Sequence, residues 1–158
     1  MKKAKPRRPP GIKVVVQNRK ARFNYEVLDQ FEAGIVLTGT EVKSLRDGKI
    51  QLVDAYATVE RSEVWLNHAH IAEYTNGTYA NHDPIRSRKL LLHRREIDRI
   101  EGKVKERGYT LIPLDVYFKE GRVKLTLGLC RGKAVHDKRH SIRERDERRA
   151  AARSLEEV

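Results

Sequence analysis

The sequence predicts a mainly β chain that folds as a single compact antiparallel barrel, and three observations support this. The length of 158 residues suits a single hydrophobic core. Seven short segments with strand character follow one another without regular alternation with helices. All ten aromatic residues lie between Phe23 and Phe118. The core therefore belongs to residues 18–131, with a basic N-terminal arm (1–17) and a flexible C-terminal tail (132–158) outside it.

The strand segments are defined by apolar alternation and by the turn residues between them. Alternation is clearest in residues 122–129, where the side chains at 123, 125, 127 and 129 are all apolar. Tight hairpin turns are expected at 61–62 and 120–121. The expected strands are 25–28, 34–37, 54–59, 63–66, 88–92, 109–118 and 122–129.

Two short helices are expected among these strands. The first covers residues 40–46, with Gly48 just past its end. The second begins after His93, where apolar residues recur at helical spacing, and it ends by Gly108. Gly102 is a candidate break within it. Many short strands with two or three small helices favour a barrel of the oligonucleotide-binding (OB) type.

The arm and the tail lack the means to form a core. The arm combines lysines and arginines with Pro6, Pro9 and Pro10. The tail has good local helix signals, such as the capping pair Ser141 and Glu144, but it is polar nearly all round. We therefore expect the tail to be disordered when free and helical against an anionic surface. The apolar stretches are too short for a signal peptide or a membrane span, which predicts a cytoplasmic protein.

Charge is concentrated at the two ends of the chain. The formal net charge is +12, yet residues 23–130 hold equal numbers of acidic and basic side chains. Residues 1–22 contain nine basic and no acidic side chains, and three of these cations, Arg19, Lys20 and Arg22, lie where the arm meets the body. This distribution predicts a polyanionic partner, with nucleic acid favoured over an anionic membrane.

Catalytic and metal sites are poorly supported. His68, His70 and His82 allow a metal-assisted nuclease as one hypothesis, but no spacing fixes a third ligand. Cys130 with His136 allows a thiol nucleophile, although a lone cysteine that closes an apolar strand is usually part of the core. A single cysteine also excludes an internal disulfide. We expect a binding protein without enzyme activity or cofactor.

Several segments occur in an order that is familiar from one protein family. They are NRKAR (18–22), FEAG (31–34), GTEVKSLR (39–46), DP (83–84), RKLLL (88–92), GYT (108–110), GK (132–133) and HDKR (136–139). Together they closely resemble the small protein B (SmpB) family, the SsrA-binding proteins of bacteria. The resemblance covers the chain apart from its first dozen residues.

The resemblance implies a function in ribosome rescue. Family members use an OB-like barrel to bind the tRNA-like part of transfer-messenger RNA (tmRNA, or SsrA) and deliver it to stalled ribosomes for trans-translation. The flexible tail enters the decoding centre and the empty mRNA channel of the small subunit. The alternative is a different OB-type ribosomal or single-strand nucleic-acid-binding protein, which exposed stacking aromatics would favour.

Matching motifs residue by residue gives the expected contacts. The tmRNA surface comprises Asn18, Arg19, Lys20, Glu32, Leu91 and Lys124, to which the basic cluster adds Arg22. The segment expected near the decoding centre is His136, Asp137, Lys138 and Arg139. Ala134 stands where many relatives carry a lysine, so a phosphate contact there is not expected. The free protein is expected to be monomeric.

Three of these residues carry expectations of their own. Strand alternation directs Leu91 outward between the core residues Leu90 and Leu92, and it directs Lys124 away from the core. Glu32 is an acid on an RNA surface, so it either reads a base or braces a neighbouring cation, and the brace is favoured.

Overall fold

The computed structural model describes residues 11–75, 81–106, 109–132 and 135–156. Of residues 135–141 and 153–156 only the backbone is described. Within these ranges, nine strands and four helices occur. None of the described helices is long and apolar enough to cross a membrane.

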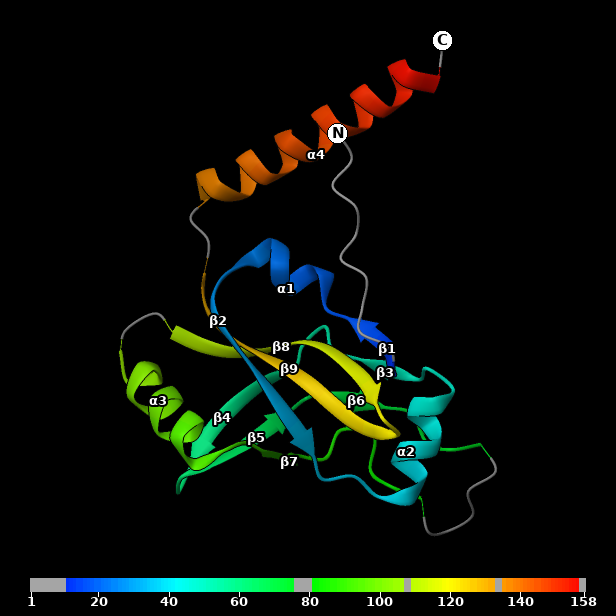
Figure 1. The fold of residues 1–158 in the computed structure, drawn as a ribbon, viewed down its shortest axis with the longest axis vertical. Coiled ribbons are helices and arrows are strands. Elements are labelled where there is room, and N and C mark those ends of the chain that lie inside the picture. Colours follow the sequence, from blue (N-terminus) through cyan, green and yellow to red (C-terminus); the bar gives the residue numbers. More distant parts are fainter. Residues whose placement is uncertain (1–10, 76–80, 107–108, 133–134, 157–158) are drawn as a thin grey trace.

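Seven of the described strands form one antiparallel sheet that closes on itself. The ring runs β8 (Tyr109–Lys119), β4 (Tyr56–Glu60), β5 (Glu63–Asn67), β7 (Arg88–Leu91), β2 (Tyr25–Ile35) and β9 (Arg122–Gly132), which pairs again with β8. β1 (Ile12–Gln17) adds to β8, and β3 (Ile50–Gln51) pairs with β6 (His70–Ile71). The expected mainly β, antiparallel architecture is therefore confirmed (Figure 1).

The two predicted hairpin turns are present. Arg61 and Ser62 have φ angles of 49° and 62°, and Glu120 and Gly121 have 51° and 78°. Positive φ at both central residues matches the right-handed twist of the strands that each turn joins. These turns set the register of β4 against β5 and of β8 against β9.

Two helices cover the ring at separate places (Figure 1). α2 (Gly39–Arg46) inserts Leu45, which is 1% exposed, and begins with a capping box between Thr38 and Glu41. α3 (Arg94–Val104) inserts Ile100, which is fully buried. Both side chains join the apolar interior of the ring. The expected break at Gly102 does not occur, because α3 continues through it.

A second, smaller core lies on the outer side of β8 and β9, beneath the short helix α1 (Arg19–Asn24). Ala21 packs there against Ile112, Leu114 and Cys130. A Cβ atom at Gly128 would lie 2.9 Å from Leu114 Cδ1, so only glycine leaves room for this packing. The small core fixes α1 on the barrel.

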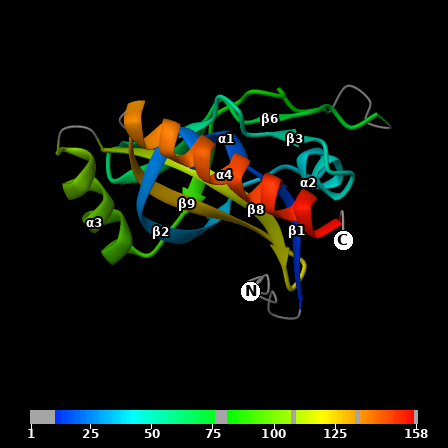
Figure 2. The same ribbon diagram turned by 90° about the horizontal axis from the view of Figure 1, so that it is seen from above.

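The last helix, α4 (Val135–Glu156), lies above α1 and away from the ring (Figures 1 and 2). Its described side chains, at residues 142–152, are all exposed. The guanidinium carbon of Arg145 lies 5.6 Å from the centre of the Phe23 ring. The helical tendency predicted for the tail is thus present, while its disorder in the free protein stays a prediction.

Several boundaries differ from the expectation. Residues 12–17 were expected in the arm, but they form β1, because their apolar side chains pack against the core. The strands expected at 25–28 and 34–37 are one strand, β2, in which the polar residues between them alternate with buried Phe31 and Ala33. The strand expected at 54–59 is displaced to Tyr56–Glu60.

Candidate nucleic-acid interface

The first candidate surface is α1, which presents Arg19, Lys20 and Arg22 to solvent. Every third or fourth position of a helix shares a face, so buried Ala21 turns the three cations outward. Within the described part of the chain none of the three forms a salt bridge, so their charges are available to a phosphate backbone.

Asn18 lies beneath this surface and holds α1 in place. It is 5% exposed, and its Oδ1 accepts a hydrogen bond from the Ala21 amide at 3.1 Å. Its Nδ2 donates to the carbonyl oxygens of Leu52 at 3.2 Å and Pro113 at 3.0 Å. The expected RNA-binding residue Asn18 is therefore the N-cap of α1, and its amide group is fully engaged within the protein.

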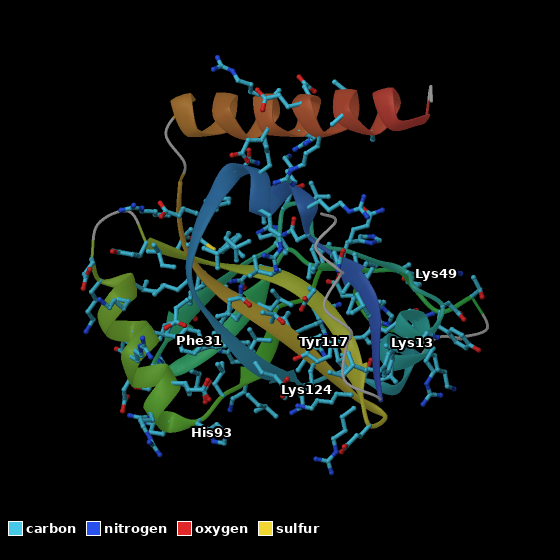
Figure 3. The ribbon with its side chains drawn as sticks, turned by 45° about the horizontal axis from the view of Figure 1, so that its top comes forward. Lys13, Phe31, Lys49, His93, Tyr117 and Lys124 are labelled. Atoms are coloured by element: carbon cyan, nitrogen blue, oxygen red, sulfur yellow. The ribbon has the colours of Figure 1, made fainter. Side chains whose placement is uncertain are left out.

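The second candidate surface combines three expected residues that are distant in sequence. Glu32 from β2, Leu91 at the end of β7 and Lys124 from β9 line one depression of about 350 Å³. Leu92, His93 and Glu96 complete its lining. Figure 3 shows Lys124 and His93 far from α1. About 25–30 Å of strand separates the two surfaces along β2, at 3.3 Å per residue.

Gly34 lies between Leu91 and Lys124 in the sheet. It pairs with Leu91 on one side and with Lys124 on the other. A Cβ atom built at Gly34 would lie 3.4 Å from Leu91 Cβ and 3.8 Å from Lys124 Nζ. Because glycine has no side chain, the side chains of Leu91 and Lys124 border an accessible strip of backbone.

Leu91 and its neighbour show the predicted alternation. Leu90 is 1% exposed in the core, whereas Leu91 is 53% exposed. Lys124 is half-buried on the face opposite the core residue Leu125. The orientations predicted for Leu91 and Lys124 are thus confirmed, and Leu91 is a large apolar side chain exposed at the edge of the depression.

Glu32 braces a cation within the protein. Its carboxylate accepts a hydrogen bond from the Tyr117 hydroxyl at 2.5 Å and lies 3.2 Å from Lys119 Nζ. The Tyr117 hydrogen bond, with smaller help from Lys119 and Lys124, lowers the pKa of Glu32. Burial of the phenol raises the pKa of Tyr117, and its hydrogen bond to Glu32 raises it further. Tyr117 and Lys119 were missed by sequence reasoning, because they lie on β8 and their side chains reach Glu32 of β2 across the intervening strand β9.

The tail segment His136, Asp137, Lys138 and Arg139 has its backbone in the first turns of α4. Its side chains lie outside the described residues.

The described histidine and cysteine side chains are not arranged as a metal site or as an activated nucleophile. His82 is buried, with Nδ1 2.9 Å from Thr40 Oγ1 and Nε2 2.9 Å from the Ile71 carbonyl oxygen. His68 was expected on one strand with His70, but it adopts a φ of 60° between β5 and β6 and stacks on Tyr56. Among the described residues no cluster of metal-type ligands occurs. Burial raises the pKa of the Cys130 thiol to about 11, so it is protonated at neutral pH.

Comparison with known proteins identifies the family of this chain. The family model described as SmpB protein matches residues 15–157. The chain belongs to the SmpB family. SmpB relatives described as SsrA-binding proteins include those of Saccharopolyspora erythraea, 56% identical over 92% of each chain, and Mycolicibacterium smegmatis, 57% identical over 90% of this chain and 89% of that one. The relative from Kineococcus radiotolerans is 55% identical over 95% of this chain and 96% of its own.

A solved structure is also similar. A chain from the structure described as "tmRNA-SmpB: a journey to the center of the bacterial ribosome" is 49% identical and superposes with a TM-score of 0.65. The match covers 81% of this SmpB-family chain and 94% of that chain.

Proposed function

We propose that this protein is an SsrA-binding factor of trans-translation. It binds the tRNA-like part of tmRNA and delivers it to stalled ribosomes. The observation that carries this proposal is family membership over nearly the whole chain, at 55–57% identity to several SsrA-binding proteins. The closed ring of strands acts as an OB-like barrel, and the protein is a cytoplasmic binding factor without catalytic function.

The two surfaces divide the work of RNA capture. Arg19, Lys20 and Arg22 neutralise phosphates, which positions the RNA without reading its sequence. Asn18 contributes by holding the helix that carries them. Glu32, Leu91 and Lys124 form the second contact, where an apolar side chain beside charged groups suits an unstacked nucleotide.

The tail serves the ribosome after capture. α4 has 22 residues, and a helix of that length is about 33 Å long at 1.5 Å per residue. His136, Asp137, Lys138 and Arg139 lie in its first turns, where they contact small-subunit rRNA at the decoding centre while the barrel holds tmRNA. The length of the remaining turns lets the far end of the helix enter the empty mRNA channel. Helix formation there depends on phosphate meeting the exposed arginines of α4, such as Arg145, Arg148 and Arg149.

A matched pair of variants tests the proposed tmRNA surface. Leu91→Ala should weaken binding of the tRNA-like part of tmRNA several-fold and leave the free energy of unfolding nearly unchanged. Leu90→Ala, one residue away in the core, should destabilise the fold by about 2–5 kcal/mol. Filter binding and urea unfolding measure the two effects. Full tmRNA affinity in Leu91→Ala would remove this residue from the surface.

The alternative OB-type binder is less well supported. A sequence-tolerant single-strand binder relies on exposed aromatic rings. Among the described residues, Tyr56 is the exposed aromatic residue, with 38% of its surface accessible. Its ring already stacks on His68. Competition decides between the two functions: unstructured poly(U) should fail to displace the tRNA-like part of tmRNA at equal nucleotide concentration.

A further inference from the structure

The depression contains a carboxylate that the proposed tmRNA contacts do not use. Glu96 lies in the first turn of α3 and is half-buried at the edge of the depression. Within the described part of the chain it forms no salt bridge and no side-chain hydrogen bond. Both of its oxygens are therefore free to accept hydrogen bonds from a ligand.

The charges of the depression argue against a site for phosphate alone. The residues that line the depression include two glutamates, Glu32 and Glu96, and one lysine, Lys124. Glu32 is already held by Tyr117 and Lys119, which leaves Glu96 as the unengaged acceptor. A phosphate beside an unengaged carboxylate is repelled. The depression instead suits a ligand that offers hydrogen-bond donors and an apolar face.

An unpaired nucleobase has both properties, and the arrangement favours guanine. The Watson–Crick edge of guanine carries two neighbouring donors, N1–H and the 2-amino group, which match the two oxygens of one carboxylate. The adjacent O6 is an acceptor that suits a lysine such as Lys124. Cytosine and adenine offer one amino group beside an acceptor, and uracil offers a single N–H. Leu91, 53% exposed over Gly34, supplies the apolar surface for the base.

We propose that this depression binds one unpaired guanine of the RNA, with Glu96 as the residue that reads the base. Leu91 contacts the face of the base and Lys124 donates a hydrogen bond to O6. Glu32 stays paired with Lys119. This inference rests on the proposed function for the identity of the RNA, but the chemistry of the depression stands on its own residues.

The direction of the affinity change in one variant distinguishes base reading by Glu96 from simple repulsion of RNA. If Glu96 were only an acid near RNA, its removal would strengthen binding at every sequence. The proposal predicts the opposite: Glu96→Ala weakens binding of the full-length protein to the tRNA-like part of tmRNA by about tenfold. Asp98→Ala is the matched control, because Asp98 is an exposed acid on the same helix that lies outside the depression. It should leave the affinity unchanged or slightly raised.

Inosine identifies the base that is read. Inosine lacks the 2-amino group and keeps O6, so replacing each unpaired guanine of the tRNA-like part in turn removes a single donor. At one position, the change from guanine to inosine should weaken binding to the wild-type protein. The same change should have little effect on binding to Glu96→Ala, which has already lost the carboxylate that reads the base. Tighter binding by Glu96→Ala, or the same loss at every position in both proteins, would overturn the proposal.

A titration with mononucleotides tests the depression independently of tmRNA. Guanosine 5′-monophosphate should shift the NMR signals of the Leu91 and Leu92 methyl groups in the wild-type protein more than inosine or cytidine 5′-monophosphate does. Glu96→Ala should abolish that preference. A preference for guanosine with no tmRNA binding would overturn the proposed function alone. Tight tmRNA binding with equal shifts from all three nucleotides would overturn the guanine site alone.

Discussion

Two arginine-rich regions of this protein use their charges in opposite ways. Arg88 is fully buried in the barrel, where it pairs with the equally buried Glu41. Arg19 and Arg22 on α1 are exposed and form no salt bridge within the described part of the chain. In sequence both regions are short basic runs. Burial and partners therefore decide which cations support the fold and which are available to RNA.

The buried region satisfies nearly every hydrogen-bond group that it contains. Glu41 accepts from Arg86 Nη2 at 2.5 Å and from the Thr38 amide at 2.9 Å, and it pairs closely with Arg88. Arg88 also donates to the carbonyl oxygens of Ala69 at 2.9 Å and Pro84 at 3.1 Å. The network joins α2 to β7 and to the segment before it. Such a network lowers the cost of burying charge, whereas α1 leaves its charges in water at little cost.

The largest expected effect comes from breaking the buried pair. Arg88→Ala leaves Glu41 as an unpaired buried charge, so it should lower the free energy of unfolding by about 3–5 kcal/mol. Lys89→Ala is the control, because its salt bridge with Glu63 is 40–44% exposed and should contribute less than about 1 kcal/mol. Urea unfolding measures both. Equal losses in the two variants would mean that the buried network gives no special support to the fold.

The next effect concerns RNA rather than stability. Replacing Arg19, Lys20 and Arg22 together by alanine should reduce the slope of log affinity against log salt by roughly 2–3, at about 0.7–0.9 for each phosphate contact. The free energy of unfolding should change by less than about 0.5 kcal/mol for each exposed position. Arg61 in the turn between β4 and β5, with Lys103 and Lys105 at the end of α3, provides a control triple with the same charge change on other elements than α1. An unchanged slope would remove α1 from the interface.

Lowering the pH tests the same comparison, because the buried region contains a carboxylate and α1 contains none. Burial opposes ionisation of Glu41, but Arg86, the Thr38 amide and Arg88 outweigh it and hold its pKa below the usual 4.5. The stability from this carboxylate is therefore complete above about pH 4.5 and is lost as the pH falls through the lower folded-state value. Urea midpoints between pH 6 and 3 should fall less steeply in Glu41→Gln than in the wild type. The α1 triple variant should keep the wild-type profile, and a flattened profile there would contradict this assignment.

The smallest effect on capture is expected from removing the tail. Truncation after Gly132 keeps the pairing of β9 with Tyr25 and removes the α4 contact of Arg145 with Phe23. The shortened protein should fold normally and bind the tRNA-like part of tmRNA with nearly full affinity, yet fail to rescue stalled ribosomes. Asp137, Lys138 and Arg139 replaced by alanine should have the same selective effect. A loss of affinity as large as that of the α1 triple variant would make the tail part of the capture surface.

The sequence by itself determined the local features of this protein. Alternation in residues 122–129 gave the inward and outward faces of β9, and the turn residues at 61–62 and 120–121 gave two hairpins. The outward position of Leu91 followed from the same two-residue period. The charge distribution and the family motifs indicated an RNA partner. These properties depend on neighbouring residues, so they can be read along the chain.

Only the tertiary structure decided how distant segments combine. Residues 12–17 became part of the sheet because β8 offered a partner more than 95 positions away. Glutamate is rarely buried without a partner, and Glu41 is buried because Arg88 reaches it from β7. Glu96 joined Glu32, Leu91 and Lys124 because closure of the ring brings β2, β7 and β9 together beside the start of α3. Such contacts depend on which strands pair, and strand pairing is fixed by packing of the whole core rather than by any local pattern.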